Sequence, residues 1–188
     1  RAAGFFDVVS LTFTGATTIF NHNLTVPPEF IVTKEYGRSY DWYAYGSVLG
    51  ANKFININSN AAATSYTFGS AVTATTFQAG LASSNQATIA YLFATLPGVS
   101  KVGSYSGTGS TINVDCGFSA GARFVLIKRT DDTQNWFVYD TARGINAAQD
   151  PYLNLNTNAA QQSSNDDIDP LSSGFSIPSG SNVNTNGA

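Results

Sequence analysis

The chain contains two copies of one sequence pattern, and this internal repeat restricts its fold more than any other feature. Phe-Ile-Val-Thr-Lys at residues 30–34 recurs as Phe-Val-Leu-Ile-Lys at residues 124–128. Asp-Trp-Tyr-Ala-Tyr at residues 41–45 recurs as Asn-Trp-Phe-Val-Tyr at residues 135–139. Both blocks are displaced by 94 positions (124 − 30 and 135 − 41). Because each copy is long enough for a small domain, we expect two units with one fold.

A later block of the repeat has a larger displacement. Phe-Ile-Asn-Ile-Asn-Ser-Asn-Ala-Ala at residues 54–62 recurs as Tyr-Leu-Asn-Leu-Asn-Thr-Asn-Ala-Ala at residues 152–160, displaced by 98 positions (152 − 54). The insertion of four residues (98 − 94) falls within residues 144–151, which contain Gly, Asn and Pro as surface loops do. We place the boundary at the Pro97-Gly98 turn, which predicts domains 1–97 and 98–188.

One apolar segment occurs in the first copy alone. Residues 88–94, Thr-Ile-Ala-Tyr-Leu-Phe-Ala, have no counterpart at the end of the second copy. A missing strand leaves unpaired backbone groups at a sheet edge and an uncovered apolar face. We therefore expect a fragment of a longer polypeptide, with an open edge beyond residues 175–177 that further sequence or another chain covers.

The local pattern predicts an all-β protein. Apolar and polar residues alternate in several segments, β-branched and aromatic residues are frequent, and Gly, Pro, Asn and Ser separate the segments. We expect two tandem antiparallel β-sandwich, jelly-roll-like units, the second lacking its last strand. The predicted strands are 6–14, 17–24, 29–36, 41–48, 53–58, 74–79 and 88–94, then 100–106, 111–118, 123–130, 135–141, 152–156 and 174–178.

Composition excludes several classes of function. The net charge of −3 and the lack of a Lys/Arg cluster are unlike a nucleic-acid-binding protein. No apolar run approaches the roughly 20 residues of a membrane-spanning helix, so we expect no membrane partner. Cys116 is the single cysteine, which excludes an intrachain disulfide and favours a buried thiol.

Four aromatic residues are the candidate binding residues: Trp42, Tyr43, Trp136 and Phe137. They occupy the same positions in the two copies and supply the largest apolar side chains. As core residues they would fill the sandwich, an interpretation that their recurrence favours. As surface residues they would form a platform on which a sugar ring stacks.

The polar residues do not form a recognisable catalytic or metal-binding motif. His22 is the single histidine, aligns with Cys116 and has no neighbouring nucleophile, so we place it on the polar face of a strand. Residues 131–132 and 165–169 are rich in carboxylates but lack the spacing of a calcium loop. We expect these loops to be solvated, and we predict no enzyme, no cofactor and no metal.

The residue pattern resembles tandem β modules in structural proteins of tailed bacteriophages. The resemblance covers nearly the whole chain and rests on residues 3–9, 96–105, 121–131, 152–160 and 169–175. It implies a virion component, such as a tail fibre or another surface appendage, located on the virion surface. The partners so implied are copies of the chain or other virion proteins, with a host surface glycan as a further candidate.

Two functions follow as expectations. The first is a non-enzymatic structural or adhesive module of a phage tail fibre or other virion appendage. The second is a carbohydrate-binding module of an extracellular adhesin or enzyme, which depends on exposed aromatic rings.

Overall fold

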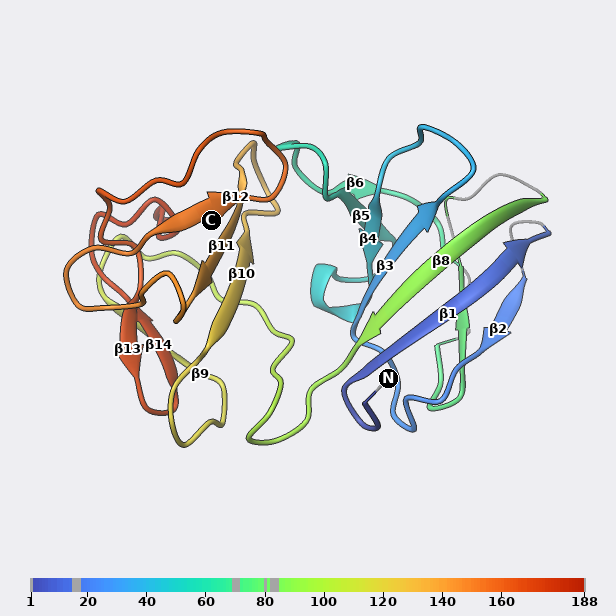
Figure 1. The fold of residues 1–188 in the computed structure, drawn as a ribbon, viewed down its shortest axis with the longest axis horizontal. Coiled ribbons are helices and arrows are strands. Elements are labelled where there is room, and N and C mark those ends of the chain that lie inside the picture. The colour runs from blue at the N-terminus through green and yellow to red at the C-terminus, as the bar shows by residue number, and fades with distance from the viewer. Residues whose placement is uncertain (1, 15–17, 69–71, 80, 82–84, 188) are drawn as a thin grey trace. The chain divides into compact units, whose positions relative to one another are not determined.

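The computed structural model describes residues 2–14, 18–68, 72–79, 81 and 85–187 (Figure 1). The first residue of the predicted strand 17–24 lies outside this part of the chain, as do residues 69–71 of the loop after residue 59. The chain divides into two compact units: unit 1 is Arg1–Ile57 with Ala63–Gly103, and unit 2 is Asn58–Ala62 with Ser104–Ala188. The predicted boundary at Pro97-Gly98 therefore lies within the last part of unit 1. In the described part of the chain, no helix has the length and apolar character needed to cross a membrane.

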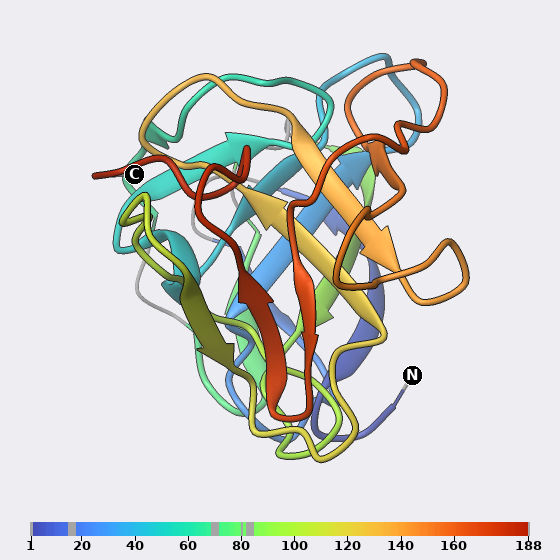
Figure 2. The ribbon, with the colours of Figure 1, turned by 90° about the vertical axis from the view of Figure 1, so that its left-hand side faces the viewer.

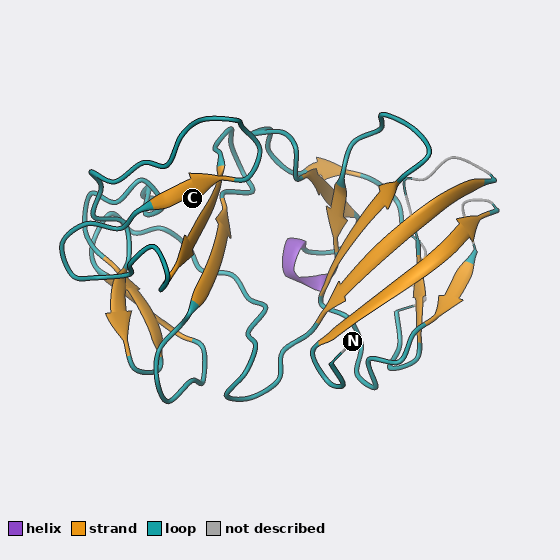
Figure 3. Ribbon diagram, in the orientation of Figure 1, coloured by secondary structure: helices purple, strands orange, loops and turns teal. Residues whose placement is uncertain are grey.

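Unit 1 is a sandwich of a six-stranded antiparallel sheet and a two-stranded sheet (Figure 3). The order of the large sheet is β1 (Phe6–Phe13), β8 (Gln86–Phe93), β3 (Phe30–Glu35), β4 (Tyr43–Tyr45), β5 (Lys53–Asn56) and β6 (Thr64–Ser65). The small sheet pairs β2 (Ile19–Asn21) with β7 (Thr76–Gln78). The 3-10 helix η1 (Ser47–Leu49) is the only helix among the described residues. Both sheets contribute to one apolar core, which includes Leu11, Ile31, Tyr45, Leu92, Phe20 and Phe77.

Unit 2 packs two three-stranded antiparallel sheets against each other (Figure 2). One sheet has the order β10 (Phe124–Lys128), β11 (Trp136–Asp140) and β12 (Tyr152–Asn154). The other has the order β13 (Asp169–Leu171), β14 (Gly174–Ile177) and β9 (Ile112–Asp115). The core between them includes Val125, Ile127, Phe137, Tyr139, Tyr152, Phe175 and Ile177. The prediction of an all-β, antiparallel sandwich fold is confirmed.

The two units have the same strand register. Each pairing below in unit 2 is obtained from unit 1 by adding the sequence displacement of 94 or 98 positions. The pairing of Ile31 with Tyr45 recurs as Val125 with Tyr139. The pairing of Tyr43 with Asn56 recurs as Phe137 with Asn154. The pairing of Phe20 with Phe77 recurs as Val114 with Phe175. The isolated bridge between Tyr152 and Gln162 likewise repeats the pairing of Phe54 with Thr64. The repeat therefore specifies which residues pair as well as which segments form strands.

Three expectations about strands are corrected. Residues 100–106 form no strand, although they align with β1. The reason is that β8 is the one strand beside β1 in its sheet, and unit 2 has no counterpart of β8 among its described residues. The edge beyond residues 175–177 is not open, because β14 lies between β13 and β9. Finally, β6 and β13 fall outside the predicted strands. They are two and three residues long, and β13 contains Pro170, which an edge strand tolerates.

Candidate binding surface

The four candidate aromatic residues have different environments in the two units. Trp42 is 37% exposed, and its ring stacks on Tyr91 of β8 with centroids 6.3 Å apart. Tyr43 is half-buried and contacts the Phe54 ring edge-on at 5.7 Å. Trp136 and Phe137 are buried, and Phe137 belongs to the core of unit 2. Trp136 and Phe137 thus offer no ring face to a sugar, and the platform hypothesis depends on unit 1.

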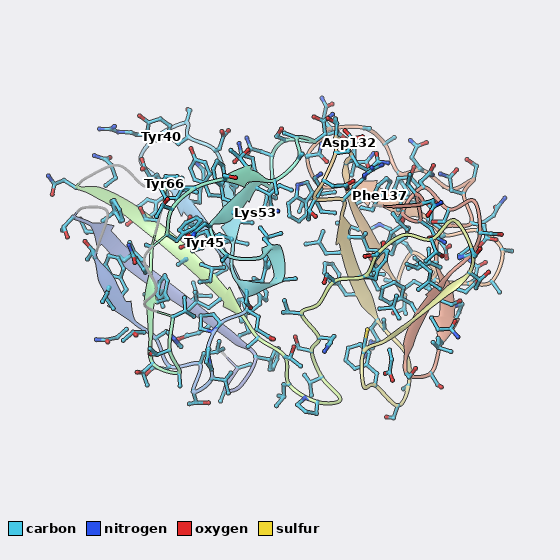
Figure 4. The ribbon with its side chains drawn as sticks, turned by 180° about the vertical axis from the view of Figure 1, so that it is seen from behind. Tyr40, Tyr45, Lys53, Tyr66, Asp132 and Phe137 are labelled. Carbon is cyan, nitrogen blue, oxygen red and sulfur yellow. The ribbon has the colours of Figure 1, made fainter. Side chains whose placement is uncertain are left out.

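A loop next to Trp42 adds two exposed tyrosines that the sequence analysis did not single out. Tyr36 and Tyr40 are 62% and 45% exposed, and both lie between β3 and β4. Figure 4 shows Tyr40 on this loop. The guanidinium group of Arg38 lies over the Tyr40 ring, 5.9 Å from its centroid, which is cation–π geometry. We call Tyr36, Tyr40, Trp42 and Tyr91 the aromatic surface of unit 1.

Lys34 holds this loop in shape. At the end of β3, its ammonium group donates to the backbone carbonyls of Glu35 at 2.7 Å, Arg38 at 3.0 Å and Tyr40 at 2.8 Å. Three donors on one ammonium group match three carbonyls that the turn would otherwise leave to water. The backbone that carries the aromatic rings is therefore fixed by a side chain from the sheet.

Polar groups border the aromatic surface. Asp41 directly precedes Trp42 in the sequence, and its Oδ2 accepts a hydrogen bond from the side-chain amide of Asn56 at 3.0 Å. Burial, and after it the negative charge of Asp41, raises the pKa of the Tyr43 hydroxyl. Sugars are bound in proteins by an aromatic face together with amide, carboxylate and hydroxyl groups, and this region of unit 1 holds all of these.

The corresponding loop of unit 2 is charged instead of aromatic. Arg129 forms a two-pronged ion pair with Asp131, with Nε–Oδ1 and Nη2–Oδ2 distances of 2.8 and 2.9 Å. Asp132 lies 3.8 Å from the same guanidinium group and is exposed. Burial lowers the pKa of Lys128, the counterpart of Lys34, to about 8. Both carboxylates of this loop are exposed, as expected, and each lies beside Arg129.

The second acidic stretch is tied into the fold of unit 2. Oδ2 of Asp150 accepts hydrogen bonds from the backbone N–H groups of Asp167 at 3.0 Å and Ile168 at 2.9 Å. In unit 1, Oδ1 of Asn52, 98 positions earlier (150 − 52), accepts from the N–H group of Phe68 at 3.1 Å. Burial raises the pKa of Asp150 against the effect of its backbone donors. These oxygens therefore anchor long connections, and the described residues include no cluster of three or more metal-ligating groups.

His22 and Cys116 are structural residues. His22 is buried rather than on a polar strand face, since its Nδ1 accepts from the N–H group of Leu24 at 3.1 Å and its Nε2 lies 3.2 Å from the carbonyl oxygen of Thr73. Those two contacts assign the ring proton to Nε2. The thiol of Cys116 is buried, as expected.

A hollow in unit 2 is lined mainly by polar residues. It has a volume of about 570 Å³ and is lined by Arg123, Asp140, Thr141, Ala142, Arg143 and Gln161. Arg143 and Asp140 form an ion pair across it. Small-molecule sites are mostly apolar concavities with a few polar groups, and the polar lining of this hollow does not match that description.

Comparison with known proteins gives a family and no named relative. A family model described as a domain of unknown function (DUF7483) matches residues 1–188. Neither the curated proteins nor the solved structures gave a match.

Proposed function

Because the chain belongs to the DUF7483 family over residues 1–188, we propose a function from its own geometry: a non-enzymatic structural and adhesive module of a virion surface appendage, such as a phage tail fibre. Its partners would be copies of the chain or other virion proteins, and its adhesive ligand a host surface glycan. The proposal rests chiefly on the shared strand register of two units whose surface loops differ.

The contrast between the loops supports the adhesive part of the proposal. Both units have a lysine near the end of the same strand, Lys34 and Lys128. Two tyrosines follow in the loop after Lys34, whereas the loop after Lys128 contains no aromatic residue. A repeated framework with one specialised loop is what a presenting module needs, because the scaffold supplies rigidity and the loop supplies specificity. Because Lys34 fixes the backbone of this loop, the backbone loses little conformational freedom when the loop binds a ligand.

Glycan-array binding tests the adhesive part. We expect the labelled chain to bind a subset of bacterial surface glycans, and Trp42→Ala and Tyr40→Ala to reduce the signal at least tenfold, since loss of an aromatic stacking contact and its neighbours costs about 1.4 kcal/mol or more. Tyr66→Ala is the matched control, because Tyr66 is also 37% exposed but packs on Phe68 elsewhere in unit 1. Equal losses in all three variants, or no glycan bound, would contradict the adhesive role.

Immunogold electron microscopy tests the location. Antibodies raised against the chain should label the surface appendages of virions that carry it. A carbohydrate-binding module of an extracellular adhesin or enzyme is the second candidate, and the stack of Trp42 on Tyr91 favours it. Glycan binding without any labelled particle would select this second function.

A further inference from the structure

The hollow of unit 2 lies where β10 begins and β11 ends. Arg123 directly precedes β10, and Asp140 is the last residue of β11. The backbone holds these two ends together, because the N–H group of Thr141 donates to the carbonyl oxygen of Arg123 at 3.1 Å. Gln161 completes the lining and lies one residue before the bridge to β12. One end of a three-stranded sheet therefore carries the hollow.

The two arginines of the hollow have different environments. Asp140 fixes Arg143, because its Oδ1 accepts from the backbone N–H group of Arg143 at 2.8 Å and its Oδ2 forms the ion pair with the guanidinium group. Arg123 is exposed, and its guanidinium group forms no hydrogen bond or ion pair with another described residue. Two guanidinium groups and one carboxylate give the hollow a net charge of +1 (2 − 1), although the chain has a net charge of −3. The guanidinium group of Arg123 is therefore available to an anion.

The positive charge at this position of the repeat is specific to unit 2. The repeat places Glu29 at the position of Arg123 (123 − 94) and Leu49 at the position of Arg143 (143 − 94). Unit 1 has the same strand register without either arginine. The shared framework therefore does not require these two side chains, and a role in ligand binding fits their place in the hollow.

An exposed aromatic ring borders the hollow. Phe124 of β10 is 61% exposed and is the register partner of Asp140 in β11. Directly opposite residues of an antiparallel pair project from the same face of the sheet, with Cβ atoms about 4.5–5.5 Å apart. The Phe124 side chain therefore lies beside Asp140, one of the lining residues. An aromatic face next to hydrogen-bonding groups is the combination that a sugar ring contacts.

We propose that the hollow of unit 2 binds an acidic sugar, which carries a carboxylate or a phosphate group. The planar guanidinium group of Arg123 binds the anionic group through two parallel N–H donors. The sugar hydroxyls exchange hydrogen bonds with Thr141 and Gln161, and the Phe124 ring contacts an apolar face of the sugar ring. The volume of about 570 Å³ lies within the range of about 300–1,000 Å³ that small-molecule sites have. A polar lining suits this ligand, because an acidic sugar presents mainly charged and hydroxyl groups.

This inference goes beyond the proposed function, because it places a second ligand site in the other unit. The aromatic surface of unit 1 carries the glycan-binding proposal, and the hollow of unit 2 shares no residue with that surface. A measurement that locates a bound sugar residue by residue therefore separates failure at one site from failure at the other.

NMR titration of the isotope-labelled chain makes this measurement. The probes are galacturonic acid, which carries a carboxylate, galactose 6-phosphate, and galactose as the neutral control. We expect saturable shifts of the backbone amide signals of residues 123–124, 140–143 and 161 with at least one acid. Galactose should bind at least about tenfold more weakly, because it makes no hydrogen bond to a charged group. The acid that binds more tightly identifies the anionic group, whereas no shift with either acid, or equal affinity for galactose, overturns the proposal.

Two variants remove the same charge at opposite ends of β10. Arg123→Gln should weaken binding of the acid at least about tenfold. Arg129→Gln is the matched control, because Arg129 directly follows β10 and pairs with Asp131. It lies six positions from Arg123 (129 − 123), about 20 Å along a strand, where screening makes its effect on binding less than about twofold.

Thr141→Val removes a hydroxyl group from the hollow without a change of charge. It should weaken binding of the acid roughly threefold to tenfold, through loss of a hydrogen bond. The spectra of all variants without sugar should retain the dispersion of the natural chain, which shows that they fold. Equal losses in Arg123→Gln and Arg129→Gln would mean that anions are attracted to the chain without a site, and would overturn the proposal.

Discussion

The hydroxyl group of Tyr139 donates a 3.0 Å hydrogen bond to Oδ2 of Asp167 inside the core of unit 2. Oδ1 of the same carboxylate accepts from the hydroxyl group of Ser181 at 3.3 Å and the N–H group of Asn182 at 3.0 Å. Burial, and after it the charge of Asp167, raises the pKa of Tyr139, so the phenol keeps the proton that it donates. The bond joins β11 to the segment before β13, and the same carboxylate binds residues 181 and 182 of the segment after β14.

Tyr139→Phe should lower the free energy of unfolding by about 1–3 kcal/mol, because the buried carboxylate loses a donor that nothing replaces. Urea denaturation measures this. Tyr45→Phe is the matched variant in unit 1: Tyr45 donates to the neutral carbonyl of Gln78 at 3.3 Å, so its loss should cost only about 0.5–1.5 kcal/mol. A larger cost for Tyr45→Phe than for Tyr139→Phe would show that the charged acceptor does not strengthen the bond.

Asp150 predicts a pH dependence of stability. Its folded-state pKa is raised from 3.8 by burial, so the folded chain holds this proton to a higher pH than the unfolded chain does. The associated stability is present below pH 3.8 and is lost as the pH rises through the folded pKa. Urea denaturation from about pH 3.5 to 6 should therefore show the natural chain losing stability relative to Asp150→Asn, by at most about 1.4 kcal/mol per pH unit.

Asp132→Asn is the control for this titration, because Asp132 is exposed and lies in another loop of unit 2. Its stability should follow that of the natural chain more closely across the same pH range. Parallel curves for the natural chain and Asp150→Asn would mean that Asp150 has the same pKa in the folded and unfolded chain.

Lys128 should react with acylating reagents at a lower pH than a solvated lysine does. Burial lowers its pKa to about 8, so about half of its amino groups are uncharged and nucleophilic at that pH. Competitive labelling with trace acetic anhydride, read by mass spectrometry, should give a midpoint near pH 8 for Lys128. Lys53, an exposed residue of β5, serves as the internal reference. A midpoint for Lys128 above pH 10 would contradict the effect of burial.

Strand pairing could be predicted from the repeat, whereas burial of individual residues could not. Trp42 and Trp136 occupy one position of the repeat, yet one is 37% exposed and the other is buried. Trp42 stacks on Tyr91, which belongs to β8, a strand with no counterpart among the described residues of unit 2. Residues 100–106 also have the expected alignment without the expected strand. In both cases the result depends on a distant strand, which local sequence patterns do not report.

Contacts of single polar side chains escaped the sequence analysis for a similar reason. Asp150 binds N–H groups of residues 167 and 168 across a long connection, and Lys34 binds three carbonyls of its own turn. Neither follows a motif with fixed spacing. The displacement of 98 positions that relates Asp150 to Asn52 was nevertheless visible, and it could have identified both as anchors of equivalent connections.

Phe30→Ala and Phe124→Ala compare two phenylalanines at the same position of the repeat, one packed on a neighbouring strand and one exposed. Phe30 packs on Phe93, so its truncation should lower the free energy of unfolding by about 1–3 kcal/mol. Phe124 is 61% exposed, so its truncation should change that free energy by less than about 0.5 kcal/mol in the isolated chain. Equal costs of the two truncations would contradict the difference in burial between Phe30 and Phe124.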